Sequence, residues 1–391
     1  MNSSLPHAIV IGLDCMTGLQ TARILAGHGV PVIGVAKSRS NPCVRTRCCE
    51  RIVFCGDELL ISTLLDVGRS MPQKATLFPC TDEAVRAISE AREQLQPYFA
   101  IDLPEREIVD TLMDKVRFCE FAQRNDLPVP ATFLLRNRAD AELAAASLSY
   151  PCMLKPPMRT PLWERNAAKV YKLADAASLL RTYDQVAPFA ELLIAQQWIP
   201  GNDSALYSCN AYFDKRSNPL VTFVARKLRQ WPPEAGTSCL GEECRDDIVL
   251  DTTIRLFQLA GFTGLAYLEM KKDAQTGEHF IIEPNIGRPT GRSAIAEAGG
   301  VELLYTKYCY NAGLPLPEKR LQTYRGVKWI HYRRDLQSAV HYWRTGELTL
   351  RQWWSSWRGR KRDALFSWND PVPFVLDLKQ AAGKFLSRAK E

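Results

Sequence analysis

The first hundred residues alternate between short apolar runs and stretches with helical spacing, and this alternation restricts the fold more than any other feature. Apolar runs of strand length occupy 7–13, 31–36, 75–78 and 98–101, and helical patterns separate them. Strands joined by helices of this length predict a parallel sheet with crossover connections. We therefore expect an α/β domain at the beginning of the chain.

Two glycines, Gly12 and Gly18, flank the turn after the first of these strands, where dinucleotide-binding turns carry theirs. Their spacing is not Gly-x-Gly-x-x-Gly, and no acidic residue ends the second strand to hold a ribose. We therefore predict that they serve only a tight turn. Asp82 follows the strand at 75–78, and we expect it to cap its helix, with a substrate crevice as the alternative.

The composition is that of an ordinary globular protein. Apolar residues make up 46% and charged residues 24%, which excludes wholesale disorder and fibrous architectures. No apolar run approaches the roughly 20 residues that cross a bilayer, and the first residues lack a basic stretch before an apolar core, so we expect a cytoplasmic protein.

None of the 12 cysteines forms a Cys-x-x-Cys pair, so we expect reduced thiols and no zinc site.

Positive charge is concentrated at the end of the chain. Lys and Arg outnumber Asp and Glu by 50 to 43 overall, and residues 319–391 hold 16 basic and six acidic residues. The same segment contains six of the nine tryptophans: Trp329, Trp343, Trp353, Trp354, Trp357 and Trp368. We rank three interpretations: tryptophans packed on the body first, contact with a membrane surface second, and stacking on nucleic-acid bases third.

Two acidic residues end neighbouring strands of a predicted hairpin. Glu269 closes the run 265–269, and Glu283 closes the run 280–283 and is followed by Asn285. Adjacent strands lie about 5 Å apart, so both carboxylates and the amide can converge. Hard oxygen ligands of this kind suit Mg²⁺ that bridges to phosphates, and we favour this interpretation over two solvated hairpin acids.

Lysines at the ends of elements supply the opposite charge. Lys115 begins a helical pattern, Lys155 ends the apolar strand at 150–155, and Arg226 lies at the basic end of another strand. A lone lysine is nearly always a solvated surface cation. Two lysines together with a downstream acid pair, however, form the mixture that a polyphosphate with Mg²⁺ requires. The lysines supply cations for the phosphate oxygens, and the acids supply carboxylates for the metal.

The order of these segments resembles the ATP-grasp superfamily of carboxylate–amine ligases. The segments are Lys115, Leu154-Lys155-Pro156, Gln196-Gln197-Trp198-Ile199-Pro200-Gly201, Leu268-Glu269 and Ile282-Glu283-Pro284-Asn285. They look most similar to the ATP-dependent carboligases that include D-aspartate ligases. The resemblance implies an α/β ATP-grasp fold behind an N-terminal parallel-sheet (pre-ATP-grasp) domain, with ATP and Mg²⁺ as cofactors.

The resemblance also implies roles for individual residues. The implied nucleotide contacts are Lys115, Lys155, Gln196, Gln197, Trp198 and Ile199, and the implied metal ligands are Glu269, Glu283 and Asn285. Arg226 would face the γ-phosphate or an acyl phosphate. Arg288 and Arg292 would clamp the carboxylate of an acceptor substrate, with a purely structural turn at 287–293 as the alternative.

Three positions depart from the family pattern. The hinge usually carries a glutamate where this chain has Gln197, and the metal motif has Gly287 where an arginine is usual, with Arg288 one residue later. The loop at 156–169, which is normally glycine-rich, contains no glycine. Either side chains cover the phosphates in place of main-chain amides, or catalysis is impaired.

We therefore expect four parts: the N-terminal domain at 1–110, a small ATP-grasp subdomain at 111–200, a large one at 201–318, and a basic helical extension at 319–391. The predicted activity is ATP- and Mg²⁺-dependent ligation of a small-molecule carboxylate to an amine, in the cytoplasm or at the inner face of the membrane. The alternatives are a non-catalytic nucleotide-binding protein and a nucleic-acid-binding module centred on the extension.

Overall fold

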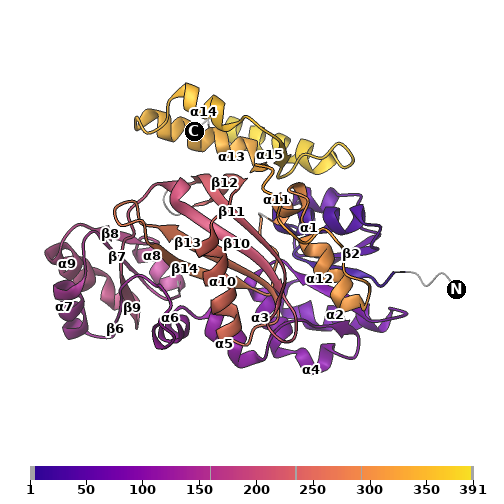
Figure 1. Ribbon diagram of the computed structural model, residues 1–391, viewed down its shortest axis with the longest axis horizontal. Helices are drawn as coiled ribbons and strands as arrows, with labels where there is room; N and C mark the ends of the chain where they lie inside the picture. Colours follow the sequence, from indigo (N-terminus) through magenta and orange to yellow (C-terminus); the bar gives the residue numbers. More distant parts are fainter. Residues whose placement is uncertain (1–4, 159, 234–235, 292, 389–391) are drawn as a thin grey trace. The chain divides into compact units, whose positions relative to one another are not determined.

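The computed structural model describes residues 5–158, 160–233, 236–291 and 293–388. The chain divides into two compact units, and Figure 1 shows their elements. Unit 1 comprises Met1–Val109, Tyr207–Tyr267 and Asn285–Glu391, and unit 2 comprises Asp110–Leu206 and Leu268–Pro284. Unit 1 therefore joins the beginning, the middle and the end of the chain. The four-part division expected from the sequence stays a prediction.

The N-terminal part of unit 1 contains the predicted parallel sheet. Its five strands lie in the order β3-β2-β1-β4-β5, and every adjacent pair is parallel. The strands are β1 (Ala8–Ile11), β2 (Val32–Ala36), β3 (Arg51–Phe54), β4 (Ala75–Pro79) and β5 (Phe99–Ala100). The apolar runs of the sequence did not predict β3, because this edge strand is only half-buried and its apolar run is short.

Helices and short 3₁₀ turns connect these strands. They are α1 (Met16–Gly27), η1 (Pro42–Arg45), η2 (Asp57–Leu59), α2 (Leu60–Arg69), α3 (Asp82–Glu90) and α4 (Arg92–Leu95). The glycines at the first turn serve its geometry: Gly12 has φ +84°, and a Cβ on Gly18 would lie 2.2 Å from the Gly12 carbonyl oxygen. The cap of α3 differs from the prediction, because Thr81, not Asp82, accepts the bond from the Ala84 amide.

Unit 2 is built on a four-stranded sheet in the order β6-β9-β7-β8. The strands are β6 (Thr132–Leu135), β7 (Cys152–Lys155), β8 (Tyr171–Leu173) and β9 (Leu193–Gln197). Helix α5 (Arg106–Met113) begins in unit 1 and ends in unit 2. The other helices of this part of the chain are α6 (Lys115–Arg124), α7 (Arg138–Ser147), α8 (Pro161–Asn166) and α9 (Ala176–Val186), and the 3₁₀ turns are η3 (Ala187–Phe189) and η4 (Asp203–Ala205). Helices α7 and α9 pack on each other, and their buried residues share one core with Trp163.

A seven-stranded sheet in the order β14-β13-β10-β11-β12-β15-β16 holds the middle and the end of the chain. Its strands are β10 (Leu206–Phe213), β11 (Pro219–Trp231), β12 (Thr237–Glu243), β13 (Gly264–Lys272), β14 (His279–Ile286), β15 (Lys328–Ile330) and β16 (Lys361–Asp363). The associated helices are α10 (Asp247–Leu259), α11 (Ser293–Ala298) and α12 (Leu303–Ala312). The predicted hairpin of β13 and β14 is confirmed, with the Asp273 amide donating to the Glu278 carbonyl over 2.7 Å.

The last part of the chain carries α13 (Tyr332–Arg344), α14 (Leu350–Ser356) and α15 (Val372–Arg388). Because β15 and β16 extend the seven-stranded sheet, this segment is built into unit 1, and the expectation of a separate helical extension is not confirmed. Among the described residues, no helix combines the length and the apolar character that crossing a membrane requires.

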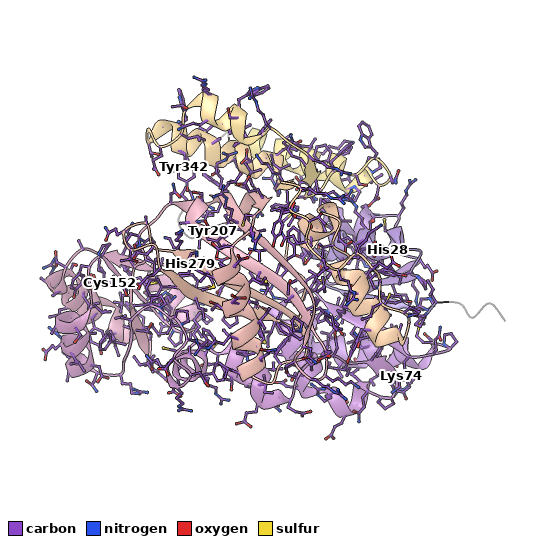
Figure 2. All side chains as sticks on the ribbon, viewed as in Figure 1. His28, Lys74, Cys152, Tyr207, His279 and Tyr342 are labelled. Carbon is purple, nitrogen blue, oxygen red and sulfur yellow. The ribbon has the colours of Figure 1, made fainter. Side chains whose placement is uncertain are left out.

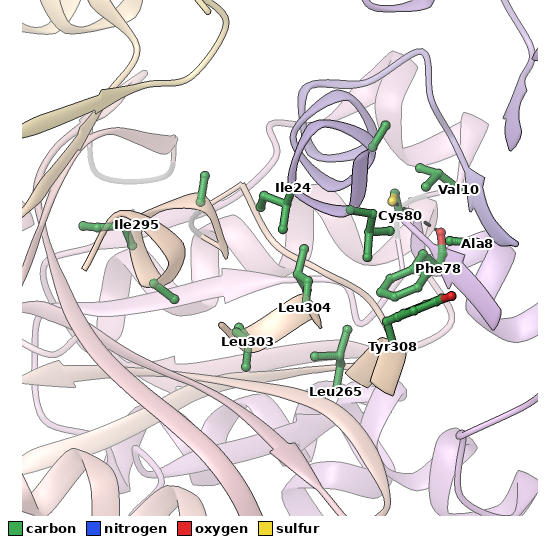
Figure 3. Packing of buried hydrophobic residues seen from close by; sticks show 14 of the residues in the cluster. Ala8, Val10, Ile24, Phe78, Cys80, Leu265, Ile295, Leu303, Leu304 and Tyr308 are labelled. Carbon is green, nitrogen blue, oxygen red and sulfur yellow. Dashed lines mark hydrogen bonds between the residues drawn. The ribbon is translucent and has the colours of Figure 1, made fainter. Parts of the chain in front are cut away.

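The main core of unit 1 joins residues from distant parts of the sequence. Figure 3 shows Val10 and Phe78 of the N-terminal sheet beside Leu304 and Tyr308 of α12, with Leu265 close by. The Tyr308 hydroxyl donates to the Pro6 carbonyl over 2.6 Å. The same core includes Trp329 of β15, whose exposed fraction is 1%. One hydrophobic core therefore holds the parallel sheet, the middle strands and the C-terminal segment together.

Candidate functional site

The two predicted lysines lie at the ends of neighbouring elements in unit 2. Lys115 is the first residue of α6, and Asp114 caps this helix by accepting bonds of 2.9 Å from the Val116 and Arg117 amides. The Lys115 ammonium donates to the Pro157 carbonyl over 2.6 Å. Pro157 follows β7 by two residues, and Lys155 is the last residue of that strand. The structure therefore brings both lysines to the same end of β7.

The charge around Lys155 is predominantly positive. Burial lowers the pKa of Lys155, the charges of Lys115 and Lys169 lower it further, and the Glu283 carboxylate acts in the opposite direction. Lys115, Lys169 and Glu283 are thus within electrostatic reach of Lys155. Ammonium groups and a carboxylate therefore act on Lys155 together, a mixture that suits a polyanionic ligand with a bound cation.

The side chain of Gln196 joins β9 to both of its neighbours in the sheet. Its Nε2 donates to the Thr132 hydroxyl of β6 over 2.8 Å, and its Oε1 lies 3.5 Å from the Lys155 ammonium of β7. This single amide therefore contacts both the half-buried lysine of β7 and the beginning of β6. Thr132 was not among the predicted site residues, because a lone threonine in a strand carries no sequence signal.

The predicted hinge continues from the end of β9. The main-chain amide of Gln197 donates to the Ala131 carbonyl over 2.9 Å, and that of Trp198 donates to the Pro151 carbonyl over 3.2 Å. Ile199 is buried, with an exposed fraction of 3%. These two amides therefore anchor the end of the strand and are already engaged within the protein.

The indole ring of Trp198 attracts two cations. The Lys172 ammonium lies 4.3 Å from the ring centroid, and the Lys271 ammonium lies 5.2 Å from it. Neither lysine was predicted. The period of two along β13 gave a usable signal for Lys271, because it places that residue on the same face as Glu269.

The glycine-free segment after β7 contains a short helix, α8, in place of an open loop. Thr160 caps this helix by accepting a bond from the Trp163 amide. The Trp163 side chain is 1% exposed in the core of unit 2, and its indole nitrogen donates to the Ala168 carbonyl over 2.9 Å. A tryptophan anchor therefore holds the segment that carries Lys169. Arg159 lies outside the described residues.

The two predicted acidic ligands lie on strands that are neighbours in the sheet. Glu269 is half-buried in β13, and Glu283 is exposed in β14. Within the described parts of the chain, no group of three or more His, Cys, Asp and Glu side chains could hold a metal ion. The predicted ligand set contains only two carboxylates and depends on Asn285 for its third oxygen, so it stays a prediction.

Asn285 is engaged by a neighbour in unit 1. Its side-chain oxygen accepts a bond of 2.6 Å from the Arg288 guanidinium, which also binds the Asp82 carboxylate with an Nε–Oδ1 distance of 2.5 Å. Asp82 thus pairs with Arg288, and its predicted role as a helix cap is wrong. The forked contact holds Arg288 between the first turn of α3 and the end of β14.

The geometry at Gly287 explains why this chain has no arginine at that position. Gly287 has φ +70°, and a Cβ there would lie 2.5 Å from the Leu103 side chain and 3.0 Å from that of Val85. A side chain at this position would strain the backbone and would require the Leu103 side chain to move. The next residue, Arg288, instead carries the charge that contacts Asn285.

The two remaining predicted arginines have different outcomes. Arg226 lies on β11 opposite Glu242 of β12, and its guanidinium binds that carboxylate at 2.5 and 2.8 Å. The Lys328 ammonium lies 3.7 Å from the other oxygen of Glu242. Arg226 is thus paired within unit 1, with 38% of its side chain exposed. Arg292 lies outside the described residues.

The predicted residues therefore form two sets. Unit 2 contains the lysines, the hinge and the two glutamates, and unit 1 contains Asn285, Arg226 and Arg288. Within unit 2, the structure brings Lys115, Lys155 and Gln196 together through hydrogen bonds. The Glu283 carboxylate interacts electrostatically with Lys155. The roles of these residues stay predictions.

Comparison with curated proteins identifies distant relatives, although no family model matches the chain. The chain is 25% identical over 258 residues to a D-aspartate ligase of Enterococcus faecium (strain Aus0004), which covers 62% of this chain and 60% of that ligase. It is 21% identical over 186 residues to a D-alanine–D-alanine ligase of Stutzerimonas stutzeri (strain A1501), which covers 44% and 54% of the two chains. The chain thus spans less than two thirds of these curated relatives.

Solved structures match a larger share of the chain. An ADP complex of N5-carboxyaminoimidazole ribonucleotide synthetase superposes with a TM-score of 0.63 at 15% identity, covering 82% of this chain and 80% of that one. A biotin carboxylase complex from Campylobacter jejuni gives a TM-score of 0.63 at 15% identity, covering 82% and 74%. The chain has an ATP-grasp fold. The ATP-grasp resemblance expected from the residues is therefore confirmed.

Proposed function

We propose that this ATP-grasp chain is an ATP- and Mg²⁺-dependent ligase that joins a carboxylate to an amine. The observation that carries the proposal is the cationic group at the end of β7, where Lys115 and Lys155 meet and Lys169 adds its charge. The Glu283 carboxylate acts on the same lysine. This combination matches the needs of a nucleoside triphosphate with a divalent ion.

The donor chemistry fits both cofactors. Lysine ammonium groups are strongly hydrated point charges that bind phosphate oxygens, and burial places Lys155 where such contacts are least screened. The carboxylates of Glu269 and Glu283 are hard oxygen ligands of the kind that Mg²⁺ takes. Lys115 and Lys155 would hold phosphate oxygens, the two glutamates would hold the metal, and Trp198 with its two lysines would border the base.

The proposed chemistry has two steps. ATP supplies a phosphoryl group: a carboxylate oxygen of the substrate forms a bond to the γ-phosphorus, and ADP leaves. The amine of the second substrate then bonds to the acyl carbon, inorganic phosphate leaves, and the ammonium proton goes to solvent. The residues would contribute by positioning the reactants and neutralising charge. Arg226 and Arg288, which pair with Glu242 and Asp82 in this structure, would bind anionic oxygens of the substrates only by exchanging those partners.

The substrates proposed are an amino acid and an amino acid or peptide-like partner. The relatives named above support this class, since one is a D-aspartate ligase and another a D-alanine–D-alanine ligase. We extend the proposal to the modification of a cell-surface polymer or its precursor, with the ATP-dependent reaction in the cytoplasm.

Acceptor-dependent release of ADP tests the proposal. The full chain is incubated with ATP and Mg²⁺ and a panel of D- and L-amino acids, singly and in pairs, and ADP and phosphate are measured. We expect release only when a carboxylate and an amine are both present, and a fall of at least about 100-fold in Glu283→Ala. Glu278→Ala, an exposed acid beside the same hairpin turn, is the matched control. Equal turnover in both variants would remove the metal assignment.

A second candidate is a nucleotide-binding protein without ligase activity. The observation that favours it is the bond from Arg288 to the Asn285 oxygen, which engages the third expected metal ligand. This candidate predicts that ATP binds, as measured by calorimetry, and that no pair of acid and amine releases ADP. The ligase proposal requires both binding and release.

A further inference from the structure

Helix α13 exposes an apolar stripe to solvent. Its exposed apolar residues are Tyr332, Leu336, Val340 and Trp343, and the last of these is 56% exposed. Their spacing of three to four residues places them on one face, whereas Asp335, Ser338 and Ala339 are buried on the side that packs against β11. The solvent-exposed face of this helix therefore carries apolar side chains, which is the reverse of the usual amphipathic arrangement.

The two neighbouring helices have the same property. In α14, Leu350 and Trp354 are separated by one turn and are 65% and 62% exposed. In α15, Val372, Val375 and Leu378 are exposed at spacings of three. Figure 1 shows α13, α14 and α15 as one layer beside β12. We call the exposed side of these three helices, together with Trp368 of the loop before α15, the C-terminal aromatic–basic surface.

The acidic residues of this segment are turned inward. Asp335 is fully buried and binds Arg229 at 2.7 Å, and Asp370 is buried and binds Arg23 at 2.8 Å. Asp377 pairs with Arg333 of α13 at 3.4 Å. Asp335 and Asp370 therefore neutralise buried arginines, and Asp377 neutralises a partly exposed one.

The basic residues of the same segment point outward. Six are exposed: Arg344, Arg351, Arg358, Arg360, Arg362 and Lys379. Among the described residues from 331 to 383, the single exposed acid is Glu347. Exposed tryptophans and aliphatic side chains interleaved with unneutralised cations are the pattern of a surface that lies at a membrane interface.

We propose that the C-terminal aromatic–basic surface binds an anionic lipid membrane. Charge complementarity selects this partner, because the cations meet acidic headgroups while the tryptophans and aliphatic side chains enter the headgroup region. A second copy of the chain would bring two cationic surfaces together, which like-charge repulsion opposes. Nucleic acid offers the right charge, but Leu336, Val340 and Leu350 have no aromatic face on which bases stack.

Co-sedimentation with lipid vesicles tests the proposal on the full chain. The probes are vesicles of phosphatidylcholine alone and vesicles that contain about 30% phosphatidylglycerol. We expect binding only to the anionic vesicles, with a blue shift of tryptophan emission, and progressive loss of binding as salt rises from about 0.1 M to about 0.5 M. Binding to neither vesicle, or to both equally, would overturn the proposal.

Two sets of variants locate the surface. The triple charge reversal Arg351→Glu, Arg358→Glu and Arg362→Glu should weaken binding to anionic vesicles by at least about tenfold. Its matched control reverses three exposed arginines elsewhere in unit 1, at Arg69, Arg86 and Arg216, and should retain binding. The second set, Trp343→Ser, Trp354→Ser and Trp368→Ser, should abolish the emission shift. Equal effects of the test and control reversals would contradict the assignment, and circular dichroism verifies that each variant is folded.

The other partners are outcomes of the same experiment. Tight binding to a single-stranded oligonucleotide without vesicle binding would replace the membrane by nucleic acid. A concentration-dependent dimer in sedimentation velocity that the tryptophan variants abolish, again without vesicle binding, would make the surface an interface between copies. The proposal is independent of the proposed ligase activity, because none of these substitutions touches the residues assigned to ATP or metal.

Discussion

At the residue scale, the turn after β14 contains a glycine, Gly287, whose backbone conformation and close neighbours both oppose a side chain. Gly287 combines a left-handed backbone with close approach to Leu103 and Val85, and it sets the direction in which Arg288 leaves the turn. From this position, Arg288 binds Asn285 and Asp82 together.

Substituting Gly287 should cost more than substituting another left-handed glycine. Gly29 has φ +74° and nothing within 4 Å of an added Cβ, so Gly29→Ala measures the backbone strain alone, about 1 kcal/mol. Gly287→Ala adds the collision with Leu103, and we expect a total loss of about 2 to 4 kcal/mol. Urea unfolding of both variants checks this. Equal losses would show that the Leu103 side chain moves aside freely.

A histidine–glutamate pair predicts how stability depends on pH. His28 stacks on Tyr305 with ring centroids 4.0 Å apart, and its Nε2 lies 3.9 Å from the Glu297 carboxylate. The neighbouring Glu297 carboxylate raises the pKa of His28, and burial raises the pKa of Glu297. Both groups therefore hold protons more tightly in the folded chain than in the unfolded chain.

The sign of the effect follows from these directions. The contribution of His28 is fully present below its unfolded pKa of about 6.5 and is lost as pH rises through the higher folded pKa. We expect the melting temperature of the wild-type chain to fall between about pH 6 and pH 8 and that of His28→Gln to change less. Glu297→Gln is the companion variant and should also flatten the profile. A profile unchanged by both substitutions would refute the pairing.

At the element scale, the segment from β7 to β8 contains a helix where the ATP-grasp resemblance implied a glycine-rich loop. Trp163 fixes α8 to the core of unit 2, and the Thr160 cap determines where the helix begins. The segment therefore places Lys169 by packing and not by loop flexibility. Any movement needed for nucleotide entry would have to displace a buried tryptophan.

Removing this anchor should release the segment. Trp163→Ala leaves a large cavity and an unpaired Ala168 carbonyl, and we expect a loss of about 3 to 5 kcal/mol in the unfolding free energy of unit 2. Leu162→Ala, at a residue of the same helix that is 52% exposed, should cost under about 1 kcal/mol. Denaturant unfolding measures both losses, and hydrogen exchange across 160–169 should accelerate only in Trp163→Ala. Equal exchange in the two variants would show that Trp163 does not anchor α8.

At the scale of the whole molecule, buried ion pairs attach the C-terminal segment to the rest of unit 1. Arg229 of β11 binds Asp335 of α13, and the indole nitrogens of Trp353 and Trp357 donate to the same carboxylate at 3.1 and 2.7 Å. Arg23 of α1 binds Asp370 and the carbonyl of Leu365. Three of the six C-terminal tryptophans, Trp329, Trp353 and Trp357, are therefore packed on the body, as the first-ranked interpretation predicted.

Breaking the first pair should destabilise unit 1 strongly. Asp335→Ala leaves the Arg229 charge and two indole donors buried without their acceptor, and we expect a loss of about 3 to 5 kcal/mol. Asp66→Ala, which removes the exposed partner of Arg69, should cost under about 1 kcal/mol. Urea unfolding followed by tryptophan fluorescence measures both. The double variant Arg229→Met with Asp335→Leu should recover most of the loss, and failure to do so would point to packing and not to charge.

The sequence alone determined the parallel α/β domain, the β13–β14 hairpin and the ATP-grasp resemblance, because local periodicity and the order of charged residues at strand ends are readable along the chain. The sequence also indicated Lys115, which begins a helix, and Lys155, which ends a strand. Strands β3, β6, β8, β12, β15 and β16 were not predicted. All of them except the seven-residue β12 have only three or four residues, which carry too little pattern.

Only the tertiary structure decided which charges meet. Asp82 and Arg288 are 206 positions apart, Arg229 and Asp335 are 106 apart, and Arg23 and Asp370 are 347 apart. No local rule connects such residues, because the free energy of an ion pair depends on the burial and distance that packing of the whole unit creates. The same packing turned the acids of the C-terminal segment inward and left its cations and tryptophans exposed.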